Sequence, residues 1–178
     1  LPGNPYHSDY LTYFINAQVW QDLDRGTVDE STLGHQLGDK IPDPNLAQNL
    51  QSIIDNFIHH MSLIEDNRSL FLNLKKTYPV YLLSNFQAVP FSNLRELHPF
   101  LYQADGAIVS AHQNLMKPEP EIYQLLLSRF KLVPQETVFI DDLPNNITAA
   151  INEGINGIVF KSPDQLKNDL TQLGINID

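Results

Sequence analysis

Apolar residues in the first third of the chain recur at helical spacing. Between Tyr10 and Trp20 they return every three or four positions, which is typical of one face of a helix. A turn is expected around Gly26, and prolines interrupt the chain at 42 and 44. The clearest amphipathic stripe follows and consists of Leu46, Leu50, Ile53, Ile54, Phe57, Ile58 and Met61. We interpret this stripe as core, and the pattern predicts an all-helical segment over residues 1–63.

From about residue 64 the pattern changes to short apolar strands that alternate with helices. The expected strands cover residues 80–83, 106–109, 137–140 and 158–160. A helix is expected to end over 70–76, and further helices are expected from the turn at Pro118 to Phe130, around 147–150, and from Ser162 or Pro163 onward. Apolar strands without polar alternation indicate a parallel sheet that is covered on both faces. The sequence therefore predicts an α/β core over residues 64–178, preceded by a helical cap.

Composition excludes several classes of function. The 178 residues include 21 acidic and 11 basic side chains, a net charge of −10, so we expect no nucleic-acid partner. The absence of cysteine excludes disulfides and thiolate chemistry. No apolar run reaches the roughly 18–20 residues that cross a bilayer, so we expect no membrane partner and a cytoplasmic protein. A net charge of this sign would repel a phosphorylated ligand unless a local cation offset it.

Polar residues suited to one task follow two of the expected strands and precede one helix. In parallel sheets, ligands bind at the carboxyl ends of the strands. Ser84 offers a hydroxyl and Asn85 an amide directly after a strand, and Lys117 supplies a positive charge. Asp141 and Asp142 are adjacent carboxylates at another strand end, which suits Mg²⁺. A hydroxyl donor, a cation and a metal seat together match the needs of phosphoryl transfer.

Three segments around these residues resemble motifs of the haloacid-dehalogenase-type phosphohydrolases. Residues 81–85 resemble the second motif, 117–123 the third, and 139–147 the fourth. Residues 20–31 also resemble the helical-cap segment of a subgroup. This subgroup includes sugar-phosphate phosphatases and the amino-terminal phosphatase domain of soluble epoxide hydrolases. The resemblance implies a Rossmann-like parallel sheet with an all-helical cap.

The resemblance also implies roles for the residues of the second and third motifs. Ser84 would hydrogen-bond the transferring phosphoryl group, and Asn85 would line the substrate site beside it. Lys117 would stabilise negative charge and orient the nucleophile. Family members often have glycine three residues before this lysine, where the present chain has Asn114. Asn tolerates a left-handed backbone best after glycine, so we expect the same loop to form.

In the fourth motif, the resemblance implies that Asp142 binds Mg²⁺ directly and that Asp141 supports the metal site from beside it. Asn146 is a candidate for a residue that supports these carboxylates without itself binding the metal. The ligand would be a small phosphorylated substrate, whose identity the sequence does not give. Specificity is expected to reside in the cap.

The family's first motif, an apolar strand that ends in the nucleophilic Asp, is not found. The Asp-Leu-Asp run at residues 22–24 is a decoy, because residues 16–21 before it are not an apolar strand and Arg25 spoils the spacing. We interpret this run as a helix end and turn within the cap. The missing strand would be central, between the strands that end at Ser84 and Asp142. Each buried unpaired backbone group would cost about 1–3 kcal/mol. We therefore expect an N-terminal segment of about 25–40 residues, or a partner that donates the strand.

The leading hypothesis is a Mg²⁺-dependent phosphatase that works through an aspartyl-phosphate. The alternative is a catalytically inactive relative used for binding or scaffolding. A receiver domain is disfavoured because its acidic pair precedes its Ser/Thr and Lys, and a dehalogenase because Asp141 and Asp142 favour phosphate chemistry. His59 and His60 are expected to be an exposed or boundary pair, and His112 a loop residue.

Overall fold

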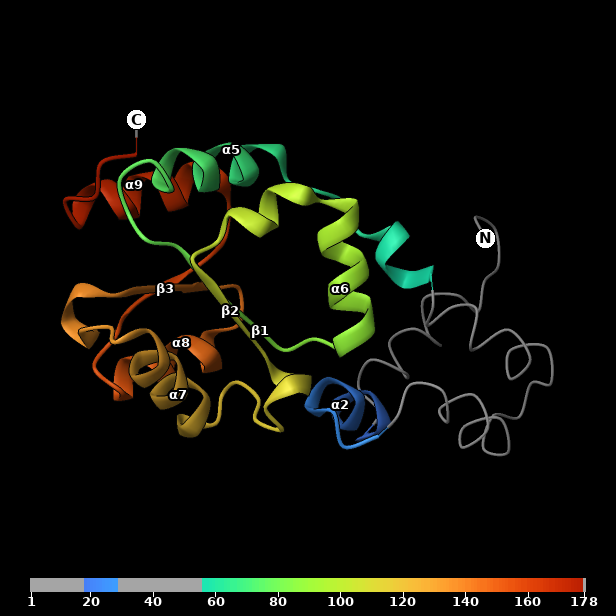
Figure 1. Cartoon of the computed structure of the whole chain (residues 1–178). Helices are drawn as coiled ribbons and strands as arrows, with labels where there is room; N and C mark the ends of the chain where they lie inside the picture. The colour runs from blue at the N-terminus through green and yellow to red at the C-terminus, as the bar shows by residue number, and fades with distance from the viewer. Residues whose placement is uncertain (1–17, 29–55, 178) are drawn as a thin grey trace.

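The computed structural model describes residues 18–28 and 56–177 (Figure 1). Helix α2 (Gln18–Arg25) and the 3-10 helix η1 (Phe57–His60) are the described elements before residue 64. Most of the predicted stripe from Leu46 to Met61 lies outside the described residues. The division into a cap over residues 1–63 and a core over 64–178 therefore stays a prediction.

The four predicted strands are present and pair in parallel. Strand β1 (Tyr81–Ser84) pairs with β2 (Gly106–Val109), and β3 (Val138–Asp141) pairs with β4 (Asn156–Val159). Strand β4 begins two residues earlier than expected, because the Asn156 N–H donates to the Thr137 carbonyl at 3.0 Å and extends the ladder. Within the described residues the two pairs remain separate two-stranded sheets. The parallel α/β class is confirmed.

Helices cover both faces of the strands (Figure 1). On one side lie α5 (Glu65–Leu74) and α9 (Pro163–Gln172), whose buried core is formed by Leu70, Ile158, Leu166 and Leu170. On the other side lie α7 (Pro120–Phe130) and α8 (Pro144–Asn152). Their core consists of Ile108, Ile122, Tyr123, Leu126, Phe139, Ile147, Ala150 and Ile155. This arrangement explains why the strands carry apolar runs without polar alternation.

Helix ends follow local sequence signals. Ser162 caps α9 by accepting from the Gln165 N–H at 3.2 Å, and Gln165 reaches back to form a capping box. Gly154 follows α8 with a φ of +83°, as expected for a residue just after a helix. Helix α7 begins at Pro120, so Pro118 lies before the helix and not in its first turn.

Helix α6 (Ala88–Leu97) was not predicted. Pro90 and the weak helix formers at 92 and 93 mask its signal, but proline is tolerated in a first turn, where its missing N–H has no intrahelical partner anyway. Burial of Phe91 against Phe86, with ring centroids 6.0 Å apart, anchors this helix. Short 3-10 helices fill the remaining connections: η2 (Pro99–Gln103), η3 (Ser110–His112) and η4 (Pro134–Glu136).

Candidate active site

Lys117 joins the carboxyl ends of β1 and β3. Its ammonium donates to the Leu83 carbonyl at 3.0 Å and to Asp141 Oδ2 at 2.6 Å. The ion pair is largely buried, with 11% of the lysine side chain and 6% of the aspartate side chain exposed. Leu83 precedes the last residue of β1, and Asp141 is the last residue of β3. This contact therefore brings Ser84 and Asp142, which follow them in the chain, to the same edge of the fold.

Asp141 accepts hydrogen bonds from three donors. Besides Lys117, the Leu143 N–H donates to Oδ1 at 2.8 Å and Asn146 Nδ2 donates to it at 2.9 Å. Asn146 is itself buried, and its carbonyl accepts from the Tyr123 hydroxyl at 2.9 Å. Burial, and then the nearby Asp141 carboxylate, raises the pKa of Tyr123. The structure thus brings Asn146 against Asp141, where the sequence predicted support.

Asn85 holds the backbone of Lys117. Its Nδ2 donates to the Lys117 carbonyl, and its Oδ1 accepts from the Lys117 N–H, both at 2.8 Å. Both polar ends of the amide are therefore engaged within the protein. The predicted contact of Asn85 with substrate stays a prediction, and the structure adds a second task, which is to fix the loop that carries the lysine.

Ser84 and Asp142 lie next to the two groups that accept from Lys117. Among the described residues, none hydrogen-bonds the Ser84 hydroxyl or pairs with the carboxylate of Asp142, which is exposed. Mg²⁺ commonly uses one or two protein carboxylates and completes its shell with water and substrate phosphate. Asp142 fits that pattern better than Asp141, whose oxygens already accept from three donors, one of them a cation.

The rest of the donor set is incomplete within the described part of the chain. No group of three His, Cys, Asp or Glu side chains suited to a metal is found there. His59, His60 and His112 are exposed, as expected for surface and loop histidines. Asp142 would therefore need further oxygen ligands from water, from substrate or from residues outside the described ranges.

The decoy run at residues 22–27 is a helix end and turn, as predicted. Helix α2 ends at Arg25, the Gly26 N–H donates to the Leu23 carbonyl at 2.9 Å, and the Thr27 N–H donates to the Asp22 carbonyl at 2.9 Å. Neither Asp22 nor Asp24 follows a strand. Neither aspartate therefore lies at a strand end, where the nucleophile of this motif is expected.

Sequence reasoning missed how closely α2 packs on the site. The buried Ser110 hydroxyl accepts from the Phe86 N–H at 2.9 Å and donates to the Asp24 carbonyl. Burial raises the pKa of the Asp24 carboxyl to about 6, and the nearby Gln87 amide lowers it to a smaller degree. Gln87 is 1% exposed, and among the described residues none lies in hydrogen-bonding geometry with its amide atoms. Only the packing of α2 reveals this polar cluster, since no motif marks it.

Comparison with known proteins agrees with the geometry. Residues 9–154 match the model of the haloacid dehalogenase-like hydrolases. The flavin mononucleotide hydrolase 1 of Arabidopsis thaliana, named as chloroplast-located, is 41% identical over 98% of this chain and 74% of its own length. The sesquiterpene phosphatase of Aspergillus oryzae is 32% identical over 83% of this chain and 75% of its own. The chain thus spans about three quarters of both relatives.

Solved structures share the fold at low sequence identity. A HAD-like hydrolase from Porphyromonas gingivalis superposes with a TM-score of 0.76 at 21% identity, covering 96% of this chain and 85% of the other. A HAD-family enzyme from Bacteroides thetaiotaomicron, solved with magnesium and inorganic phosphate, gives 0.68 at 18% identity, covering 87% and 82%. No helix in the described ranges has the length and apolarity to span a membrane. The chain belongs to the haloacid dehalogenase-like hydrolase family and is a hydrolase of the phosphatase type.

Proposed function

We propose that this protein is a Mg²⁺-dependent phosphatase that acts on a small phosphorylated metabolite through an aspartyl-phosphate. The observation that carries the proposal is the position of the Lys117 ammonium between the ends of β1 and β3. Ser84 and Asp142 flank that position, and neither is engaged by another described side chain. A cation, a hydroxyl and a carboxylate at this edge of the fold would together supply the groups that phosphoryl transfer needs.

Each group has a task that its chemistry allows. The Ser84 hydroxyl would donate to a phosphoryl oxygen, and Lys117 would offset the charge that develops on the other oxygens. Asp142 would hold Mg²⁺, which when bound neutralises phosphate charge in an overall acidic protein. Asp141 would keep the Lys117 ammonium in place, and Asn146 would keep Asp141 in place.

The nucleophilic aspartate is proposed to lie on a strand that fits between β1 and β3 and is not among the described residues. Within those residues the two strand pairs do not join. Ile140 on β3 is 37% exposed, whereas strands of parallel sheets are normally buried on both faces. A further strand and helix, from this chain or from a partner, would bridge the pairs and cover Ile140. The family resemblance would place an aspartate at the end of that strand, next to Lys117.

Phosphate release from a panel of phosphomonoesters tests the proposal. The panel should include flavin mononucleotide and ribitol 5-phosphate, because phosphatases of this family carry those substrates in their names. The full-length protein should release phosphate with Mg²⁺, lose that activity with EDTA and regain it when Mg²⁺ is restored. Mass spectrometry of an acid-quenched reaction should find phosphate on an aspartate outside the described residues. Release that is unaffected by EDTA, or phosphate on a serine or histidine, would refute the mechanism.

A further inference from the structure

A bidentate ion pair connects α2 to the loop that carries Lys117. Arg25 Nη1 donates to Glu119 Oε2 at 3.0 Å, and Nη2 donates to Oε1 of the same carboxylate. Both side chains are about one-third exposed. Parallel hydrogen bonds of this kind fix geometry as well as charge, and only arginine among the basic residues can form them.

Glu119 passes this restraint to the residues around Lys117. Its Oε2 also accepts from the Met116 N–H at 3.0 Å, and its own N–H donates to the Met116 carbonyl at 2.8 Å. Residues 116 and 119 are therefore bonded to each other twice and enclose Lys117. Pairing with Arg25 is the main cause that lowers the pKa of Glu119, so the carboxylate remains charged at neutral pH.

Asn114 adds a second contact between the same two segments. It has a φ of +55°, the left-handed conformation expected from the sequence. Its Nδ2 lies 3.3 Å from the carbonyls of both Arg25 and Gly26, and its own carbonyl accepts from Arg25 Nη1 at 3.3 Å. A glycine here could not make the side-chain contacts. The departure from the family pattern thus coincides with an added bond to α2.

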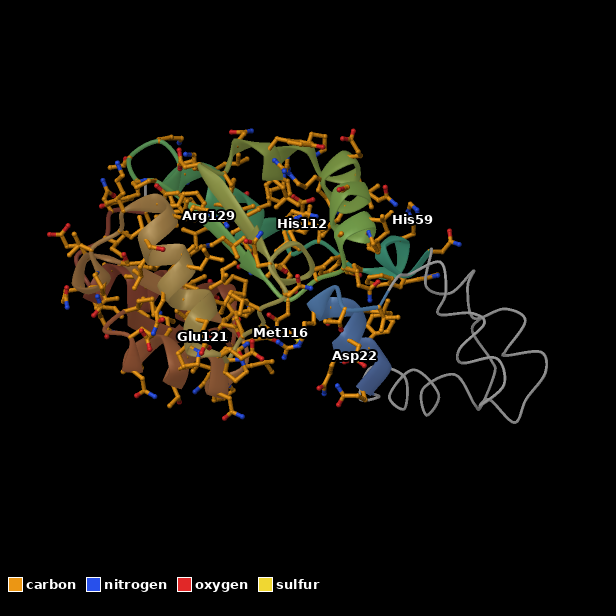
Figure 2. All side chains as sticks on the ribbon, turned by 60° about the horizontal axis from the view of Figure 1, so that its bottom comes forward. Asp22, His59, His112, Met116, Glu121 and Arg129 are labelled. Carbon is orange, nitrogen blue, oxygen red and sulfur yellow. The ribbon has the colours of Figure 1, made fainter. Side chains whose placement is uncertain are left out.

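Gly26 allows the close approach. Its φ is +77°, and a Cβ atom at this position would lie 2.2 Å from the Ala111 carbonyl oxygen. Figure 2 shows α2, labelled at Asp22, beside the loop labelled at His112 and Met116. The backbone at residues 25–26 therefore packs directly on residues 110–114.

We propose that Arg25 is a positioning residue, which acts through Glu119 to hold Lys117 where its ammonium reaches Leu83 and Asp141. Asn85 fixes the Lys117 backbone from the β1 side, and Arg25 fixes the flanking residues from the α2 side. Any displacement of α2 would then shift the position of Lys117. The consequence for catalysis rests on the proposed phosphatase function, whereas the positioning of the lysine does not.

Competitive acetylation of the full-length protein tests the positioning without using activity. Trace acetic anhydride followed by peptide mass spectrometry reports the reactivity of each lysine, with the exposed Lys131 and Lys161 as references. Lys117 should react far less than these references in the unmodified protein, because its side chain is only 11% exposed and its ammonium donates to Leu83 and Asp141. Arg25→Gln should raise its relative labelling about fivefold. Labelling of Lys117 in Arg25→Lys should be intermediate between the unmodified protein and Arg25→Gln, because lysine keeps the positive charge but cannot form two parallel hydrogen bonds with Glu119.

Two comparisons separate this effect from general loss of structure. Lys75, paired with Asp105 far along the chain from Arg25, should stay protected in every variant that folds. The matched control Arg68→Gln removes an exposed ion pair with Glu65 on α5 and should leave Lys117 labelling unchanged. Glu119→Gln should raise labelling as Arg25→Gln does, and the double variant should raise it no further than Glu119→Gln alone.

Unchanged Lys117 labelling in both Arg25→Gln and Glu119→Gln overturns the proposal. Increased labelling together with a lower kcat and little change in KM supports it, and increased labelling at unchanged kcat overturns the catalytic consequence. If the unmodified protein releases no phosphate while the labelling responds as expected, the proposed function fails and the positioning stands. If Lys75 also becomes reactive in Arg25→Gln, that variant has lost structure generally, and the milder Arg25→Lys is used instead. Unchanged Lys117 labelling in Arg25→Lys then overturns the proposal, and increased labelling supports it.

Discussion

Replacing Lys117 by Met removes the cation from a buried ion pair and leaves its partner in place. The Asp141 side chain is 6% exposed and would keep only two donors, the Leu143 N–H and Asn146 Nδ2. Breaking a buried pair on one side typically costs about 3–5 kcal/mol. The two remaining donors place the cost at the lower end, about 3 kcal/mol. For a chain of this size that corresponds to a fall in Tm of about 6–12 °C.

Urea unfolding followed by far-UV circular dichroism measures this cost, with Asp141→Asn and the double variant beside it. The double variant removes both charges, so it should be more stable than Lys117→Met alone, with a coupling energy of at least about 2 kcal/mol. All three variants should lose phosphate release. If Lys117→Met unfolds within about 1 kcal/mol of the unmodified protein, or if the single effects simply add, the ion pair does not have the energetic role that its burial indicates.

Three further changes test other parts of the structure. Asp24→Asn should raise Tm at pH 8 by about 4–8 °C and leave it unchanged near pH 3. Because the pKa of Asp24 is raised to about 6 in the folded protein, its carboxylate destabilises the fold above that pH and has no effect below its pKa in the unfolded chain. If Asp24→Asn and the unmodified protein have the same Tm at both pH values, the burial argument is refuted. Asp142→Asn should raise the Mg²⁺ concentration for half-maximal activity at least about tenfold, with Tm within about 2 °C, because this side chain is exposed; an unchanged Mg²⁺ requirement would remove it from the metal site. Gly26→Ala should destabilise by about 2–3 kcal/mol more than Gly174→Ala, since both have a φ of +77° but only Gly26 faces another backbone; equal losses in urea unfolding would contradict the close approach.

The strands and the motifs at their ends could be predicted from sequence because their signals are local. Apolar runs such as 106–109 are bounded by polar or turn-forming residues, and parallel topology follows from the helices between them. The left-handed Asn114 could be predicted because the resemblance implies a glycine-type turn at this position and Asn tolerates that backbone best after glycine. Helix α6 could not be predicted, because Pro90 indicates a helix break, and only the structure reveals that the buried Phe91 anchors a helix here.

Long-range partners are the part of the site that sequence could not supply. Arg25 and Glu119 are 94 positions apart, and either charge alone is typical of a solvated surface residue. Asn85 reads as a substrate ligand beside Ser84, but only the fold reveals that its amide holds the Lys117 backbone. Pairings of this kind depend on how segments dock, which no local pattern encodes.

The position of Lys117 ties the stability of the protein to its chemistry. Its ammonium donates to Leu83 near the end of β1 and to Asp141 at the end of β3, and so joins the two strand pairs. The same ammonium supplies the positive charge that a phosphoryl group would need. Weakening either contact would therefore change folding and activity together, so variants at Lys117 or Asp141 cannot separate the two. Asp142 can, because its exposed carboxylate supports no packing within the described residues. A higher Mg²⁺ requirement in Asp142→Asn at unchanged Tm would thus assign chemistry to this edge of the sheet independently of stability.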